Sequence, residues 1–155
     1  MTPIERIEAE QAIARIVYDY ANAVDTGDLE KIREIFRYGA VRVDGVEEEH
    51  HGGDGVVDMF RRYTRFFPDG TPSTKHVTTN LVIDVDPGGD RATSRSYFTV
   101  LQARPELPLQ IVIAGRYLDT FERRDDGWWL VDRFEYCDLV GDLSQHIMDS
   151  PLPTR

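Results

Sequence analysis

An acid, a phenol and an imidazole in this chain are residue types that can form a proton-transfer site. Asp25 and Tyr20 lie near the end of one predicted helix, and His76 lies at the start of a predicted strand. A carboxylate that bonds one imidazole nitrogen fixes the tautomer and makes the other nitrogen a better base. A nearby phenol can donate its hydroxyl to a carbonyl or a leaving oxygen. These three residues are therefore candidates for general acid–base catalysis.

Asp25 occupies an electrostatically poor position for an acid. Apolar residues recur at helical spacing between Ile7 and Val24, and Gly27 predicts the end of this helix. Asp25 therefore lies at the negative end of the helix dipole. Local rules are expected to fail at functional sites, although an acid here can also be an ordinary helix-end residue.

His76 presents a problem of strand parity. In strict alternation it falls opposite the apolar Val77, Leu81 and Ile83 of the same predicted strand. Only a β-bulge, or a sheet buried on both faces, would give both sets apolar surroundings. The alternative interpretation is a hydrogen-bonded histidine without a catalytic role.

Arg133 is a fourth candidate, on a predicted hairpin strand among apolar neighbours. A buried guanidinium needs a partner. A substrate oxygen, Asp25 or a structural carboxylate would each satisfy it, and the sequence leaves these three open.

Other chemistries have weaker support. His50, His51 and Asp54 lie among glutamates and glycines at irregular spacing, which is typical of a solvated loop, so we predict no metal site. Cys137 has no signature of a catalytic thiol. His146, near the carboxyl terminus, is interpreted as exposed unless it closes over a cavity.

Composition limits the partners. The chain has 155 residues and a net charge of -10, which opposes binding to nucleic acid or anionic lipid. It has no apolar run of roughly 20 residues and no visible signal peptide, and its single cysteine fits a reducing compartment. We therefore expect a cytoplasmic protein, bound to neither nucleic acid nor membrane, with a small and largely apolar ligand.

Three predicted helices precede a long antiparallel meander. Gly27 ends the first helix, and Asp28 and Asp54 are candidate caps of the second and third. A short strand is predicted at 40–43, between the second and third helices, and the strands of the meander are predicted at 75–86, 91–102, 110–124 and 128–138. Helices first and a meander afterwards indicate an α+β domain over residues 1–140, with its helices on one sheet face and a tail at 141–155.

Four segments resemble the SnoaL-like branch of the nuclear transport factor 2-like superfamily. They are residues 20–29 (YANAVDTGDL), 75–80 (KHVTTN), 115–121 (GRYLDTF) and 126–133 (DGWWLVDR). The resemblance covers roughly residues 5 to 140. It implies a cone-shaped, curved antiparallel sheet wrapped around the amino-terminal helices, a cystatin-like α+β barrel, with a deep apolar pocket at its open end.

The resemblance also assigns roles to residues. Scytalone dehydratase, bile acid dehydratases and hexachlorocyclohexane dehydrochlorinase carry an aspartate–histidine dyad, which Asp25 and His76 match. Bile acid dehydratases have a tyrosine five residues before the aspartate and an arginine in the last hairpin strand, matched by Tyr20 and Arg133. The dehydrochlorinase has a lysine in place of Tyr20, which makes dehalogenation less favoured here.

We therefore predict a cofactor-independent, dehydratase-like lyase or isomerase that removes a proton from a hydrophobic cyclic small molecule. Two alternatives stay open: a non-catalytic ligand-binding or assembly subunit, and a polyketide-type aldol cyclase using the same residues. Exposed sheet surface predicts a homodimer or homotrimer. The predicted pocket walls are Val24, Phe36, Phe60, Tyr63 and Trp129.

Overall fold

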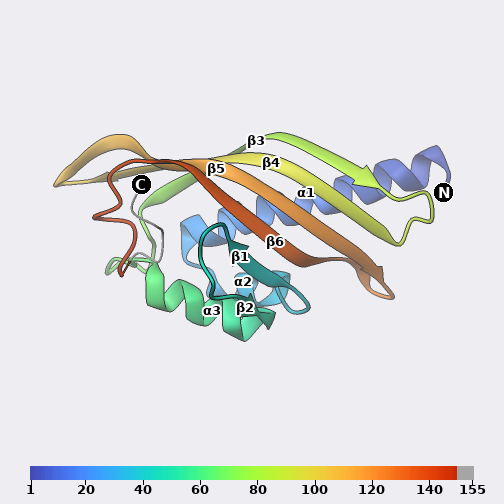
Figure 1. The fold of residues 1–155 in the computed structure, drawn as a ribbon, viewed down its shortest axis with the longest axis horizontal. Helices are drawn as coiled ribbons and strands as arrows, with labels where there is room; N and C mark the ends of the chain where they lie inside the picture. Colours follow the sequence, from blue (N-terminus) through green and yellow to red (C-terminus); the bar gives the residue numbers. More distant parts are fainter. Residues whose placement is uncertain (150–155) are drawn as a thin grey trace.

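A long sheet curves around the first helix, and two shorter helices lie below it (Figure 1). The computed structural model describes residues 1–149. Its helices are α1 (Pro3–Thr26), α2 (Leu29–Ile35) and α3 (Gly52–Tyr63). Its strands are β1 (Ala40–Val43), β2 (His50–His51), β3 (Thr74–Val85), β4 (Arg91–Arg104), β5 (Leu107–Arg124) and β6 (Gly127–Val140).

Local signals fix both ends of α1, the helix that carries Tyr20 and Asp25. The Thr2 side chain accepts a hydrogen bond from the Glu5 backbone, and the Glu5 side chain accepts one from the Thr2 backbone, which forms a capping box. Gly27 ends the helix in the left-handed conformation, with φ 70°. The predicted end of α1 is confirmed, and Asp25 lies in its last turn.

Of the two predicted caps, one is confirmed and one is wrong. Asp28 caps α2, because its side chain accepts a hydrogen bond from the Lys31 backbone. Helix α3 begins at Gly52, ahead of the predicted cap Asp54. Asp54 instead lies in the first turn of α3, where its carboxylate accepts a hydrogen bond from Arg33 of α2.

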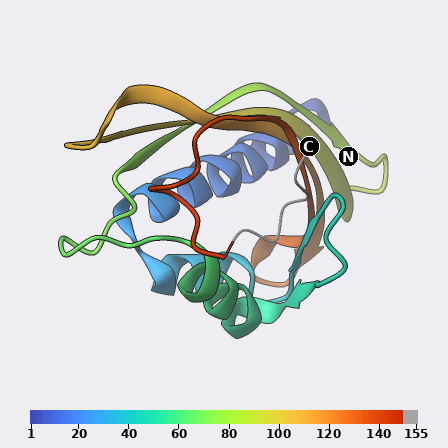
Figure 2. The same ribbon diagram turned by 60° about the vertical axis from the view of Figure 1, so that its left-hand side comes forward.

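The sheet has six strands in the order β2-β1-β6-β5-β4-β3 and is not closed. The four long strands form the predicted antiparallel meander. The sheet as a whole is mixed, because β1 pairs in parallel with β6. The predicted curved sheet around amino-terminal helices is confirmed. Figure 2 shows α1 and the shorter helices within the curve of the sheet.

A β-bulge in β3 resolves the parity problem of His76. The pairing with β4 shifts register between Thr79 and Val82, and Asn80 has a left-handed backbone with φ 54°. Before the bulge, His76 is on the partly buried side of the strand. After the bulge the alternation is shifted by one residue, so that Leu81 is on this same side. The concave face of one strand therefore includes residues of both parities.

The concave face holds the core, which packs α1, α2 and α3 against the inner side chains of the sheet. No helix among residues 1–149 is long and apolar enough to cross a membrane. Large apolar side chains are exposed near the ends of β5 and β6, at Leu109, Ile111, Leu139 and Val140. The homodimer or homotrimer predicted from exposed sheet surface stays a prediction.

Candidate functional site

Asp25 and His76 form a tight pair between the end of α1 and the start of β3. The Oδ1 atom of Asp25 lies 2.6 Å from Nδ1 of His76, and both side chains are less than a tenth exposed. Because Nδ1 carries the bond to the carboxylate, Nε2 is the ring nitrogen left for another partner. His76 lines the cavity described below and Asp25 does not. The imidazole therefore stands between the carboxylate and the cavity.

Two further donors hold the Asp25 carboxylate in place. The His76 backbone N–H donates to Oδ2 at 2.8 Å, and the Thr74 hydroxyl donates to Oδ1 at 2.8 Å. Burial opposes ionisation of Asp25, but the hydrogen bonds and charge of His76 together with Thr74 outweigh it and lower its pKa. Asp25 is therefore an ionised, fixed acceptor at neutral pH.

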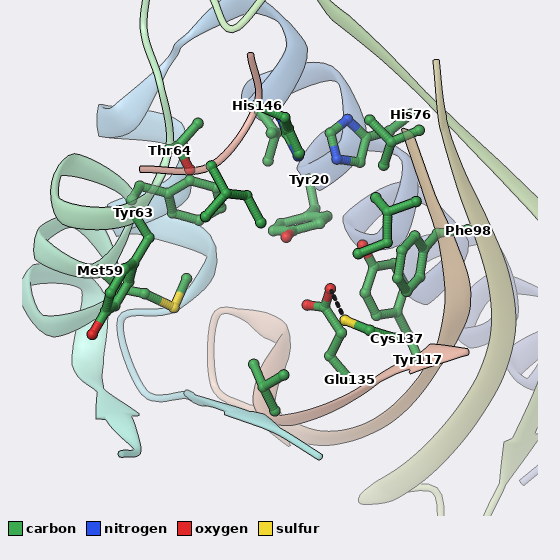
Figure 3. Close-up of a pocket in the computed structure, with 16 residues that line it drawn as sticks. Tyr20, Met59, Tyr63, Thr64, His76, Phe98, Tyr117, Glu135, Cys137 and His146 are labelled. Carbon is green, nitrogen blue, oxygen red and sulfur yellow. Dashed lines mark hydrogen bonds between the residues drawn. The ribbon is translucent and has the colours of Figure 1, made fainter. Parts of the chain in front are cut away.

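A cavity of about 120 Å³ opens beside His76 on the concave side of the sheet (Figure 3). One ordered water needs roughly 10–15 Å³ on the same measure, so the space suits a small organic molecule. The walls come from α1, α3, the inner faces of β1 and β3–β6, and residues 141–149, which we call the C-terminal strap. The lining residues are Tyr20, Val24, Val43, Met59, Phe60, Tyr63, Thr64, His76, Phe98, Val100, Ile113, Tyr117, Glu135, Cys137, His146 and Ile147.

Tyr20 lines this cavity and is held by other aromatic rings. Its ring makes edge contacts with Phe36 and Tyr117, at centroid separations of 5.9 and 6.0 Å. Burial raises the pKa of Tyr20 to about 12, so its hydroxyl stays protonated at neutral pH. Tyr20 is thus a fixed hydrogen-bond donor beside the cavity.

Arg133 is placed beneath the cavity rather than in it. Its Nε and Nη2 atoms donate to the two carboxylate oxygens of Asp119 at 2.8 and 2.7 Å, and both side chains are fully buried. The guanidinium lies between the rings of Tyr20 and Tyr117, about 4 Å from each centroid. Nη1 has no hydrogen-bond partner within residues 1–149, but it too is buried. Of the partners left open by the sequence, the structural carboxylate is the one observed, and no contact with a ligand is available to Arg133 here.

The five predicted wall residues separate into two groups. Val24, Phe60 and Tyr63 line the cavity. Phe36 does not, because it is fully buried in the core behind Tyr20. Trp129 does not either, because its ring packs on Tyr38 and its indole N–H donates to Asp126, outside the concave face. The prediction was therefore wrong for these two residues.

The polar cavity residues that were not among the sequence-based candidates include Tyr117 and Glu135. Tyr117 stacks on Phe98 beside Tyr20, and Glu135 projects into the cavity from β6 (Figure 3). Alternation from Arg133 along β6 was a usable signal for Glu135, since positions two apart share a face. His146 was interpreted from the sequence as exposed unless it closes over a cavity; it is 8% exposed and lines the cavity, so the alternative is the one observed.

His146 is carried over the cavity by the C-terminal strap. Backbone hydrogen bonds tie the strap to the end of α3: Arg65 donates to His146, and Met148 donates to Tyr63. The His146 ring centroid lies 6.5 Å from that of His76. Burial and the neighbouring His76 lower the pKa of His146 to about 4, so it is a neutral imidazole at physiological pH. The predicted tail covers residues 141–155. The structure describes residues 141–149, and positions 150–155 lie outside the described residues.

The chemical capacity of the site follows from these placements. One imidazole nitrogen, backed by a fixed carboxylate, faces an apolar cavity that also contains a protonated phenol. Within the part of the chain that the structure describes, no group of three or more His, Cys, Asp or Glu side chains is arranged to hold a metal ion. The arrangement suits proton removal from a small apolar molecule.

The fold is similar to those of several solved proteins. An NTF2-like protein with a cystatin-like fold from Novosphingobium aromaticivorans is 19% identical, with a TM-score of 0.74 over 87% of this chain and 85% of that one. Hexachlorocyclohexane dehydrochlorinase LinA-type3 from Novosphingobium barchaimii is 18% identical, with a TM-score of 0.72 over 96% and 95%. A protein of unknown function from Mycobacterium tuberculosis, solved as a single-residue variant, is 27% identical, with a TM-score of 0.71 over 90% and 78%.

Sequence comparison gives the family. No curated protein matches the chain. The family model for the SnoaL-like domain matches residues 5–133, which is most of the sequence. The chain therefore belongs to the SnoaL-like domain family.

Proposed function

We propose that this protein is a dehydratase-like lyase or isomerase that uses His76 as a general base and needs no cofactor. The observation that carries the proposal is the orientation of the dyad. Asp25 binds Nδ1 of His76 at 2.6 Å, and the imidazole lines an apolar cavity. A base placed in this way typically contributes about 10²–10⁴-fold to the rate of a proton transfer.

The proposed reaction begins with proton removal from carbon. Nε2 of His76 takes a proton from a carbon next to a carbonyl or a leaving group, and the Asp25 carboxylate stabilises the imidazolium that forms. Tyr20 donates its hydroxyl to the oxygen on which negative charge develops, a kind of contact worth about 3–4 kcal/mol in an oxyanion site. The electron pair left on carbon then forms a double bond as the leaving group departs, or is protonated elsewhere to give an isomer.

The cavity also favours an enzyme over an assembly subunit. A scaffold role predicts a pocket that is shallow or filled by side chains, with His76 bonded only to structural groups. Instead the space beside His76 is about 120 Å³, and most of its lining is apolar. A neighbour of the same fold, the LinA-type3 protein, is named for eliminating hydrogen chloride from a cyclic molecule. We infer a small, cyclic and largely apolar substrate.

The test is a substrate screen followed by substitution of the base. Thermal-shift screening of hydroxysteroids, cyclic hydroxyketones, phenols and terpenoids should identify cavity ligands, which are then assayed for elimination and isomerisation. We expect His76→Ala to reduce the turnover of a confirmed substrate by about 10²–10⁴-fold. His51→Ala is the matched control, because His51 is an exposed histidine outside the cavity. Unchanged turnover in His76→Ala would show that the base is wrongly assigned.

A further inference from the structure

We propose that Glu135 is a second acid–base residue of this cavity, which gives a proton to a departing oxygen while His76 takes a proton from carbon. The inference rests on the proposed function, because it requires His76 to act as the base. It adds the class of leaving group: an oxygen that needs a proton in order to depart, such as a hydroxyl.

The position of Glu135 makes it a partner of His76 across the cavity. Glu135 lies on β6 and His76 on β3, with β5 and β4 between them in the sheet. Both side chains line the same space, and Figure 3 shows Glu135 reaching into it below Tyr20. A molecule in the cavity can therefore contact the base on one side and the carboxyl group on another.

Among the ion pairs of residues 1–149, Arg133 is joined to Asp119 and not to Glu135. A partly buried glutamate in apolar surroundings normally requires a charged partner, and Arg133 is two residues away on the same face of β6. However, Asp119 takes both Nε and Nη2 of Arg133. Glu135 instead accepts a long hydrogen bond, 3.9 Å, from the weakly donating thiol of Cys137. A structural ion pair with Arg133 therefore does not account for this carboxyl group.

The surroundings favour the protonated form of Glu135. Among residues 1–149 it is the only carboxyl side chain in the cavity lining, and the other lining residues include the apolar Val43, Val100 and Ile113. Burial raises the pKa of Glu135, and the positive charges of Arg133 and His76 only partly offset that rise. A carboxylic acid kept protonated by an apolar site can donate a hydrogen bond or a proton.

The proton and electron balance is complete for loss of water from a β-hydroxyketone. Nε2 of His76 takes the proton from the carbon between the two functional groups, and that electron pair forms the new carbon–carbon double bond. The carbon–oxygen bond breaks, and the oxygen leaves as water with the Glu135 proton. One net transfer from His76 to Glu135 through solvent then restores the starting protonation states.

The experiment separates the two proton transfers by the choice of leaving group. The probes are 3-hydroxycyclohexanone, whose hydroxyl must be protonated in order to leave as water, and 3-acetoxycyclohexanone, whose acetate leaves without protonation. Deuterium exchange at carbon 2 in D₂O reports the action of His76 alone. We expect Glu135→Gln, which keeps the shape but has no acidic proton, to slow loss of water by about 10²-fold or more. Exchange and loss of acetate should change by less than about threefold.

Several outcomes would contradict the inference. If Glu135→Gln slows all three reactions equally, the residue only maintains the cavity. If it slows none, it has no role. Glu135→Asp, which keeps an acidic proton on a shorter side chain, should recover part of the lost dehydration rate, and failure to exceed Glu135→Gln counts against proton donation. If the wild-type protein neither exchanges nor eliminates either probe, the proposed function fails for this substrate class, and the role of Glu135 fails with it.

A readout without turnover tests the protonated carboxyl group directly. The infrared spectrum of the wild-type protein at pH 6 should contain a protonated carboxyl band that Glu135→Gln removes. Glu106→Gln is the matched control, because Glu106 is exposed in the turn between β4 and β5. If the Glu135→Gln difference spectrum shows a carboxylate band instead, the residue is ionised and the proposal is overturned.

Discussion

Two carboxylate–base pairs lie close to Tyr20, and they differ in whether the basic side chain can still contact a ligand. Asp119 and Arg133 are fully buried, and two parallel hydrogen bonds occupy both carboxylate oxygens. Asp25 and His76 are joined by one side-chain hydrogen bond and are 9% and 8% exposed. Aromatic rings cover the guanidinium, whereas the imidazole borders the cavity. The first pair is enclosed, whereas in the second pair, within residues 1–149, only Nδ1 of the imidazole carries a side-chain hydrogen bond.

This difference indicates how a buried charge relates to function. In the sequence, Arg133 and His76 look alike, because each is a basic residue among apolar neighbours. Arg133 stays charged whatever its surroundings, and its fork fits one carboxylate completely. His76 has two nitrogens, and one bond to Asp25 prepares the other for a proton. We therefore expect the first pair to matter chiefly for stability and the second chiefly for activity.

Matched carboxylate-to-amide substitutions should separate the two pairs most clearly. Asp119→Asn leaves the Arg133 charge buried without a counter-ion, so we expect a loss of about 3–5 kcal/mol in the free energy of unfolding. Asp25→Asn should cost less, about 1–3 kcal/mol, because hydrogen-bonding capacity is only partly lost. Its amide would donate to Nδ1 of His76 and move the ring proton to Nε2, which would reduce activity by about 10²–10⁴-fold.

Urea unfolding of both variants, with turnover measured under native conditions, checks this prediction. Both variants should retain the wild-type dependence of free energy on urea concentration. If Asp25→Asn proves the more destabilising while retaining activity, the two pairs have been assigned the wrong roles.

The place of Asp25 was predictable from the sequence because its determinants are local, whereas its pairing with His76, 51 residues away, was implied by the family resemblance. The helix ends at Gly27, and this places Asp25 in the last turn of α1. The obstacle was strand parity, and a β-bulge was one of the two solutions that the sequence allowed. The bulge lies at Asn80, a residue type that tolerates the left-handed backbone. The position of the bulge was not predictable from the sequence. Nothing in the sequence distinguishes Asn80 from the other polar residues of this strand as the place where the pairing shifts.

The cavity lining was less predictable because it depends on how distant segments pack. Trp129 was among the predicted pocket walls, and strict alternation would place it on the same strand face as Arg133. The pairing of β5 with β6 shifts register between Thr120 and Phe121, and Leu130 rather than Trp129 is buried. His146 was interpreted as exposed because nothing near it in sequence shows that the strap returns to α3. Long-range pairing of this kind is set by tertiary contacts rather than by local propensity.

His146 can be compared with Arg133 and His76, because it is a buried basic side chain for which no hydrogen bond to a carboxylate is seen within residues 1–149. The pKa of its side chain falls from 6.5 to about 4 on folding. Between these two values the unfolded state binds more protons, so stability is full above pH 6.5 and declines as the pH falls toward 4. We expect the strap to lose about 2 kcal/mol of stability at pH 5 relative to pH 7.5. Amide hydrogen exchange of residues 141–149 at the two pH values measures this loss.

His146→Leu is the control for that measurement, since a leucine keeps an apolar side chain in place of the neutral ring. The pH dependence of exchange in the strap should largely disappear in this variant. If the dependence persists, it arises from His76 or Asp25, the other titratable groups that act electrostatically on His146.

The smallest expected effect is the most direct test of the contrast between the pairs. A buried ion pair can often be replaced by apolar residues of similar volume with little change in stability, or even a gain. We expect Asp119→Leu combined with Arg133→Met to unfold within about 2 kcal/mol of the wild-type protein. The same exchange at the dyad, Asp25→Leu with His76→Met, should also fold, but without measurable turnover. Chemical denaturation and the substrate assay, applied to both double variants, give the comparison.

The reason for expecting similar stabilities but different activities is that an enclosed pair interacts only with the fixed protein groups around it. Removing both partners removes both the attraction and the cost of burying two charges, so these terms largely cancel. A pair that presents a free nitrogen to a cavity also interacts with a third molecule, and no apolar substitute reproduces that interaction. If the Asp119→Leu and Arg133→Met variant instead loses activity while remaining folded, then Arg133 contributes to catalysis through the rings of Tyr20 and Tyr117 that it supports.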